Sequence, residues 1–353
     1  MTPQEPELAC ADLPAVGGRI GPEPEDFVVD EVLDREPSGS GEHLFVRIEK
    51  RVLNTQDAVH AVARAAGVRA PDVGSAGMKD KHAVTRQWLS LPPGASDPGS
   101  WQLPEGLSVV ESTRNEKKLR TGQLSGNRFR IRLHEANANA NAACAAIVAR
   151  IVEQGLPNYF GAQRFGIAGQ NLDRALHWLR SGDAARGRGS RFHKKLYPSV
   201  IQSEIFNRYL TRRRALGLST LLVGEVVRLD GSNSVFVVEE PERELPRLTS
   251  KDIHLTGPMP GPKMKKPSGV PAELEAAVLG ELELSDDLLS GLARHAPGTR
   301  RDLLVFPEGL EARVLDANVV ELSFFLPSGS YATELVRQLT RAPFLEPRRD
   351  RDR

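Results

Sequence analysis

The sequence predicts an α+β protein in which one domain is inserted into another. At 353 residues the chain is long for a single hydrophobic core, so two domains are expected. The first and last parts of the chain share a sheet-plus-helix style, whereas residues 157–303 have the composition of a separate small α/β module. We therefore expect one domain made from residues 1–156 and 304–353, with the module inserted between its two parts.

Two strands and one helix are predicted near the N-terminus. Residues 27–33 and 44–50 are rich in strand-favouring residues, and the turn at 37–41 is rich in Pro, Ser and Gly, so we expect a hairpin. The apolar spacing of residues 57–66 predicts a helix that ends at Gly67.

Two further strands are predicted at residues 107–112 and 129–133, followed by an Ala-rich helix at 135–154. The second strand alternates apolar and basic residues, so one of its faces would pack on the core while its basic side chains point the other way. These basic residues are Arg128, Arg130 and Arg132.

The rest of the chain alternates helical and strand-like segments. Helices are predicted at 171–181, 199–216, 272–280, 285–294 and 331–340. A hairpin is predicted within 221–238, an irregular segment at 257–269, and strands at 303–306, 312–315 and 319–326. The charged tail at 348–353 lacks apolar residues and is typical of a disordered segment.

Within residues 74–90, a glycine-bounded turn displays Asp80 between Lys79 and Lys81, ahead of a strand-like run. Two neighbouring ammonium groups favour the ionised carboxylate, which makes Asp80 a candidate nucleophile or base. An isolated Lys-Asp-Lys turn is more often a solvated hairpin tip, so this turn does not define a site by itself.

Composition excludes several classes of protein. The two cysteines, Cys10 and Cys144, form no CxxC pair, so neither a disulfide framework nor a zinc site is indicated. The acidic, Pro-rich N-terminus is wrong for a signal peptide, and no apolar run approaches a membrane span, so we expect a soluble cytoplasmic protein. The fingerprints of P-loop NTPases, serine hydrolases, zinc proteases and dinucleotide-binding enzymes are missing from the sequence.

Six separated stretches together resemble the tRNA pseudouridine synthase D (TruD) family, and the resemblance covers nearly the whole chain. They are Pro24–Val29, Gly41–His43, Ala76–Thr85, Gly126–Phe129, Asn158–Gly166 and Leu326–Thr333. The resemblance implies a pseudouridine-synthase-type catalytic domain with a mixed, mainly antiparallel sheet and flanking helices, and an inserted α/β TRUD domain. It also implies isomerisation of a uridine, at position 13 of tRNA, to pseudouridine.

The resemblance also implies the residues of the site. Asp80 would be the essential carboxylate, acting either as a nucleophile or as a base that removes the C2′ proton. Phe27 would stack on the flipped uracil, and Tyr331 stands where the family usually has Phe. The remaining expected substrate contacts are Lys79, Lys81, Asn127, Phe129, Asn158, Phe160, Gln163 and Arg164. The alternative for Asn158, Phe160, Gln163 and Arg164 is that they form a packed structural loop without contacting substrate.

The sequence departs from the family pattern at Gly21, where relatives usually carry a Lys or Arg that pairs with the aspartate. Arg19, Lys79 and Lys81 are alternative basic partners, and the sequence does not decide between them.

We expect tRNA as the partner, no cofactor, no metal, no protein partner and a monomer. The net charge is only +1, so RNA affinity would depend on local basic clusters. The candidates are Arg114, Lys117, Lys118, Arg120, Arg128 and Arg130; Arg186, Arg188, Arg191, His193, Lys194 and Lys195; and Arg212, Arg213 and Arg214. A noncatalytic RNA-binding protein of the same shape is the alternative function, and the intact Asp80 turn favours the enzyme, since phosphate binding alone would not require an anion there.

Overall fold

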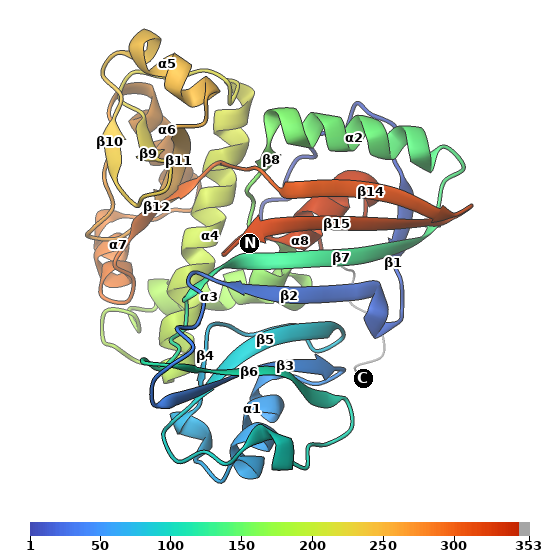
Figure 1. Ribbon diagram of the computed structural model, residues 1–353. Coiled ribbons are helices and arrows are strands. Elements are labelled where there is room, and N and C mark those ends of the chain that lie inside the picture. The colour runs from blue at the N-terminus through green and yellow to red at the C-terminus, as the bar shows by residue number, and fades with distance from the viewer. Residues whose placement is uncertain (346–353) are drawn as a thin grey trace, which may run out of the picture.

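The computed structural model describes residues 1–345, which form a large sheet, a four-stranded sheet and a two-stranded ribbon (Figure 1). The predicted disordered tail at 348–353 lies outside the described residues. The two-stranded ribbon pairs β8 (Leu156–Pro157) with β13 (Leu304–Val305), so the chain enters and leaves the smaller sheet region at one place.

Within residues 1–345 the large sheet has nine strands, with β1 pairing β7, β4 pairing β5, and the others in the order β14-β15-β7-β2-β5-β3-β6. Its strands are β1 (Gly17–Ile20), β2 (Phe27–Leu33), β3 (His43–Arg51), β4 (Gly74–Ser75), β5 (Val84–Leu91), β6 (Leu107–Asn115), β7 (Leu124–Ala136), β14 (Glu308–Asp316) and β15 (Val319–Pro327). The β2–β5 pair is parallel and its other described pairs are antiparallel. The predicted α+β class with a mainly antiparallel sheet is confirmed.

The predicted hairpin between residues 27–33 and 44–50 is wrong. Both segments are strands, but β5 lies between β2 and β3 and pairs with each of them. A parallel pair such as β2–β5 needs a crossover connection, and β3 together with the helix that follows it supplies this connection.

Three helices cover the two ends of the large sheet. Helix α1 (Thr55–Ala65) lies below β3 and β5 in Figure 1, whereas α2 (Ala140–Gln154) lies above β14, and α8 (Ala332–Thr340) packs with α2. Each end has its own apolar cluster, one including Ile48, Val62 and Leu89 and the other including Ile131 and Leu322. The middle of the sheet therefore lies between two separate hydrophobic cores.

The termini of the predicted helices were only partly correct. Helix α1 begins after Asn54, whose side chain accepts the backbone N–H of Asp57, and Gly67 follows it at a φ of 71°. Helix α2 begins at Ala140 rather than at residue 135, because β7 continues to Ala136. The Asn-Ala alternation at residues 136–141 runs from a turn into the first turn of α2.

Residues 157–303 supply most of a further hydrophobic core, in which α4 packs against α3, α6 and β11, and Phe344 from near the C-terminus also belongs to it. The strands of this part of the chain are β9 (Val226–Leu229), β10 (Val235–Val237), β11 (Ile253–Met259) and β12 (Thr299–Asp302). Its helices are α3 (Gln170–Arg180), α4 (Arg191–Ala215), α5 (Pro241–Thr249), α6 (Gly269–Glu281) and α7 (Asp286–Ala293). Helix α5, which contains two prolines, was not predicted, and the segment expected to be irregular at 257–269 begins inside β11.

Every helix among the described residues is too short or too polar to span a bilayer. In the same part of the chain, no three His, Cys, Asp or Glu side chains lie together in an arrangement that could bind a metal ion.

Candidate active site

A row of directly paired residues crosses the middle of the large sheet. Lys50 of β3 pairs with Thr85 of β5, Thr85 pairs with Val29 of β2, and Val29 pairs with Phe129 of β7. Side chains of directly paired residues lie on the same face of a sheet. The row spans three strand spacings, about 14 Å, and its Lys50, Thr85 and Val29 side chains are buried.

Polar side chains continue on this face in the neighbouring row. Glu31 of β2 pairs with Asn127 of β7, and Gln87 of β5 follows Thr85 on the same face. Two polar atoms here, Thr85 Oγ1 and Asn127 Oδ1, are buried and have no hydrogen-bond partner among the described residues. Buried polar atoms normally have partners, so these two are candidates for a contact that the described residues do not supply.

We call these two rows of side chains on β3, β5, β2 and β7 the polar strip. The loop that carries Asp80 lies over it. The loop leaves β4 where Ser75 pairs with Leu89 and joins β5 at Val84, so it runs back along β5. Gln87 Nε2 donates to the Gly77 carbonyl at 3.4 Å, and Lys50 Nζ donates to the Asp80 carbonyl at 2.6 Å. Because Gln87 and Lys50 point to the strip face, their bonds hold the loop on that face.

The N-terminus of α1 also fixes the loop, and the Asp80 side chain is left exposed. Thr55 Oγ1 accepts the backbone N–H of Lys79 at 2.9 Å and donates to Gln87 Oε1 at 3.1 Å. Asp80 itself is exposed, as the sequence predicted for a displayed turn. The structure therefore presents one carboxylate on a backbone that is held by buried side chains.

Lys79 does not pair with Asp80. Its ammonium bonds to Glu31 Oε2 at 2.7 Å, and both side chains are almost fully buried. The other Glu31 oxygen accepts the backbone N–H of Trp88 at 2.9 Å, which fills the space where β2 and β5 separate. The charge of Lys79 is therefore matched by Glu31, so the expectation that Lys79 supports the charge of Asp80 is corrected.

Lys81 is exposed, and within residues 1–345 its side chain forms neither a hydrogen bond nor an ion pair. Substrate contact by Lys81 therefore stays a prediction.

The basic residue beside Asp80 is Lys50, which sequence reasoning missed. A side chain at Gly21 would collide with the Asp26 carboxylate and the His134 ring, and Arg19 is paired with Glu135 at 2.6 Å. Burial lowers the pKa of Lys50 to about 8, while the nearby Asp80 carboxylate raises it. One signal was present in the sequence: Lys50 continues the alternation of Leu44, Val46 and Ile48, which places an ammonium on the core face.

Two of the predicted substrate-contacting aromatics lie together on the strip face. Phe27 and Phe129 are half-buried, and their rings meet edge to face with centroids 6.2 Å apart. Phe129 also stacks on Phe324 of β15 at 5.3 Å. Together these rings form an apolar wall beside Asn127, which is the kind of surface on which an unstacked base can lie.

Two of the predicted substrate contacts, Phe160 and Arg164, pack against Tyr331, just before α8. Phe160 is buried and meets the Tyr331 ring edge to face at 5.8 Å. The Tyr331 hydroxyl accepts a hydrogen bond from Arg164 Nε at 3.1 Å, so the hydroxyl that distinguishes Tyr from Phe has a partner. Gln163 is exposed. The substrate roles of these residues stay predictions.

Arg301 is a second residue that the sequence did not single out. Its guanidinium lies 4.1 Å from the centroid of Phe160 and donates to the side-chain oxygen of Asn158 at 2.6 Å. Burial lowers the pKa of Arg301 to about 10. Asn158 also donates to the Asp302 carbonyl at 3.0 Å. Both the oxygen and the nitrogen of its side-chain amide are therefore hydrogen-bonded at the junction between the two sheet regions.

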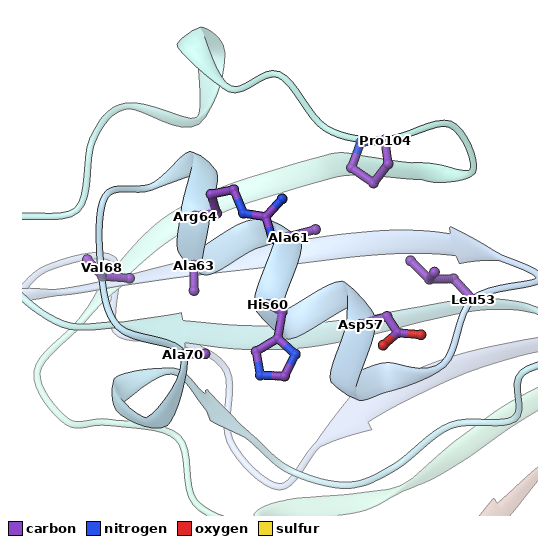
Figure 2. Close-up of a pocket in the computed structure, with 9 residues that line it drawn as sticks. All are labelled: Leu53, Asp57, His60, Ala61, Ala63, Arg64, Val68, Ala70 and Pro104. Carbon is purple, nitrogen blue, oxygen red and sulfur yellow. The ribbon is translucent and has the colours of Figure 1, made fainter.

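A cavity of about 550 Å³ lies elsewhere, along α1, and none of the predicted site residues lines it. Figure 2 shows Asp57, His60 and Arg64 on the helix side of this cavity. The candidate active site is therefore the polar strip under the Asp80 loop and not this cavity.

The three basic clusters differ in what the fold does with them. The first two are largely exposed, and the second begins α4 beside Phe192, which is 68% exposed. The third is not a phosphate-binding face. Arg213 is fully buried against Glu225 at 2.7 Å, and Arg212 pairs with Glu281. Successive residues of a helix point in different directions, so three consecutive arginines do not share one face.

The arginines of β7 lie on the opposite face of the sheet from the Asp80 loop. Arg128 and Arg130 are exposed there, and Arg132 pairs with Glu321 at 2.9 Å. Their alternation is confirmed, but they face away from the polar strip, so they cannot contact a base bound on it.

Comparison with solved structures defines the class of protein. A structure from Methanosarcina mazei assigned to tRNA pseudouridine synthase D (TruD) matches this chain with a TM-score of 0.74 and 25% sequence identity, over 96% of this chain and 97% of that one. The mainly antiparallel sheet, with its flanking helices, is thus a pseudouridine-synthase-type α+β fold.

Sequence comparison gives the family. The family model for tRNA pseudouridine synthase D (TruD) matches residues 5–186 and 189–339. Relatives called tRNA pseudouridine synthase D in Anaeromyxobacter sp. (strain Fw109-5) and Anaeromyxobacter dehalogenans (strain 2CP-C) are each 40% identical, covering 98% and 97% of this chain and 99% of each relative. The chain belongs to the tRNA pseudouridine synthase D family.

Proposed function

We propose that this protein is an isomerase that converts a uridine of tRNA, at position 13, to pseudouridine, with Asp80 as the essential carboxylate. Membership of the family supports the reaction and the substrate class. The observation that carries the assignment of Asp80 is the geometry of its loop: the carboxylate is exposed, while Lys50, Thr55 and Gln87 hold the backbone around it.

The chemistry requires little beyond one ionised carboxylate and a pocket for the base. The N1–C1′ bond is broken, the uracil rotates, and C5 bonds to C1′ with no net oxidation or reduction. Asp80 would either attack a carbon of the substrate or remove the C2′ proton, and both roles need an ionised carboxylate. No cofactor enters either route.

The target uridine must leave the RNA stack to reach Asp80. We propose that Phe27 and Phe129 receive the uracil ring, and that the unpartnered Asn127 Oδ1 accepts a hydrogen bond from its edge. An acceptor suits the N3–H group of the uracil in uridine, which is a donor. Thr85 Oγ1, also unpartnered, lies on β5 directly beside Lys50, two strands from β7, and is a second candidate for this contact.

We propose that residues 157–303 form an inserted domain that holds tRNA against the catalytic domain formed by residues 1–156 and 304–353. The division is supported by a hydrophobic core that comes mostly from residues 157–303, with Phe344 as its member from the C-terminal part. Exposed basic residues and Phe192 at the start of α4 support RNA contact, because phosphate binding needs cations and bases stack on aromatic rings. Since the substrate would be tRNA, we propose that the protein acts in the cytoplasm, as a monomer.

The test is a reaction of the purified protein with unmodified tRNA transcript and no added cofactor. We expect one pseudouridine per transcript at position 13, and none in a transcript that carries cytidine there. Tight tRNA binding without any pseudouridine would contradict the proposal and favour a noncatalytic RNA-binding protein.

A further inference from the structure

Lys50 is in an unusual position for a lysine. Its side chain is fully buried, and it is the one lysine among residues 1–345 with no exposed surface. Its ammonium donates to the Asp80 carbonyl at 2.6 Å but forms no ion pair with a carboxylate of the described residues. Burying a charge without a matched partner is costly, so a lysine here calls for an explanation other than stability.

Two other nearby cations have different partners, and Lys81 is exposed. Lys79 is bonded to Glu31, and Arg51, the next residue of β3, points to the opposite face and binds Glu25 at 2.7 Å. Lys50 is therefore the cation that is both buried under the Asp80 loop and bonded to it.

We infer that Lys50 is a positioning residue for Asp80: its ammonium fixes the loop through the Asp80 carbonyl and provides the positive charge that holds the Asp80 carboxylate over the polar strip. This inference rests on the proposed function. An ammonium has three donors, and the carbonyl uses one of them. The positive charge therefore lies beside the Asp80 backbone, where it would attract the Asp80 carboxylate and favour one orientation of it.

The charged surroundings of Lys50 predict how it responds to pH. Of the loop residues, Asp80 raises its pKa and Lys79 lowers it, but burial is the largest influence and brings the pKa to about 8. The residues that neighbouring strands pair with Lys50 are Thr85 of β5 and Leu107 of β6, which do not titrate. The positive charge is therefore present below pH 8 and is lost as the pH rises through about 8.

The experiment compares wild type, Lys50→Arg and Lys50→Met in single-turnover reactions with tRNA between about pH 6.5 and pH 9.5. For wild type we expect the rate to fall above about pH 8. Lys50→Arg should keep a measurable rate without this fall, because a guanidinium stays protonated throughout the range. Lys50→Met should lose on the order of 100-fold in rate near pH 7 while its Kd for tRNA stays within about threefold of wild type.

Lys251→Met is the matched control, since it removes an exposed ammonium that lies over Phe306, away from the strip. It should behave as wild type at every pH. A melting curve for each variant separates loss of fold from loss of rate.

Three results would overturn the inference. These are a wild-type rate for Lys50→Met, the same fall above pH 8 in Lys50→Arg as in wild type, and a wild-type profile with no fall. The test of the wild-type pH profile does not depend on whether any variant folds. An inactive wild type would overturn the proposed function itself, whereas an active wild type with unaffected Lys50 variants would overturn only the role of Lys50.

Discussion

Replacing Lys79 with Met should destabilise the protein rather than merely weaken RNA binding. The change removes the ammonium that lies 2.7 Å from Glu31 while keeping most of the aliphatic chain. The side chains of Lys79 and Glu31 are 6% and 0% exposed, so the carboxylate cannot be rehydrated without a local rearrangement. Breaking a buried ion pair by removing one partner typically costs 3–5 kcal/mol. Because Glu31 keeps the backbone N–H of Trp88, we expect the lower end, about 3 kcal/mol.

A double-mutant cycle in urea measures this coupling. Lys79→Met, Glu31→Gln and the double variant are unfolded alongside wild type, and the free energies of unfolding are compared. The double variant should be less destabilised than the sum of the single variants by at least about 1.5 kcal/mol, since it has no uncompensated buried charge. As a control, Arg69→Met removes an ion pair with Asp72 whose side chains are 83% and 38% exposed, and no measurable loss is expected.

Additive effects in this cycle would refute the reasoning. So would a Lys79→Met variant whose free energy of unfolding is within about 0.5 kcal/mol of wild type, the range of ordinary surface substitutions. Either result would mean that Lys79 is free to contact substrate instead.

The remaining predictions concern the base and the phosphates. Phe27→Ala should lose roughly 1–3 kcal/mol of base stacking, seen mainly in turnover, whereas Phe325→Ala, on the other face of the sheet, should leave turnover unchanged. Wild-type kinetics for Phe27→Ala would remove that ring from the site. If about six phosphates are bound, tRNA affinity should fall roughly a thousandfold between about 50 and 200 mM salt. A flat salt response would exclude the two exposed basic clusters as the RNA contact.

Short-range sequence patterns correctly predicted the features that depend on neighbouring residues alone. The alternation in β7 predicted which way its arginines point, and the glycine after α1 predicted where that helix ends. The hairpin was wrong because strand pairing is a long-range choice: β5 pairs with both β2 and β3 although it is distant from β2 in sequence. A turn rich in Pro, Ser and Gly does not reveal that a third strand will enter between its flanking strands.

The same limit applies to the site. Asp80 could be singled out because its glycine-bounded turn is a local feature, but the partner of Lys79 is a glutamate 48 residues away, and local spacing does not show that contact. Lys50 was overlooked because what distinguishes it is its burial under the Asp80 loop, which lies 30 residues further along the chain. Arg213 was assigned to an RNA-binding face because its buried partner, Glu225, lies beyond the end of the helix.

The central claim is that Asp80 is the carboxylate of a tRNA uridine isomerase, and Asp80→Asn tests it most directly. The amide keeps the size of the side chain and much of its hydrogen bonding, but it can neither attack nor accept a proton. The exposed position predicts an unchanged melting temperature, and removal of an anion facing RNA predicts unchanged or slightly tighter tRNA binding.

The measurement is paired: single-turnover pseudouridine formation and tRNA affinity for wild type and Asp80→Asn in the same buffer, with melting curves for both. We predict a folded variant that binds tRNA and forms no detectable pseudouridine. Turnover within about tenfold of wild type, a loss of only about 1.4 kcal/mol of transition-state stabilisation, would contradict the account.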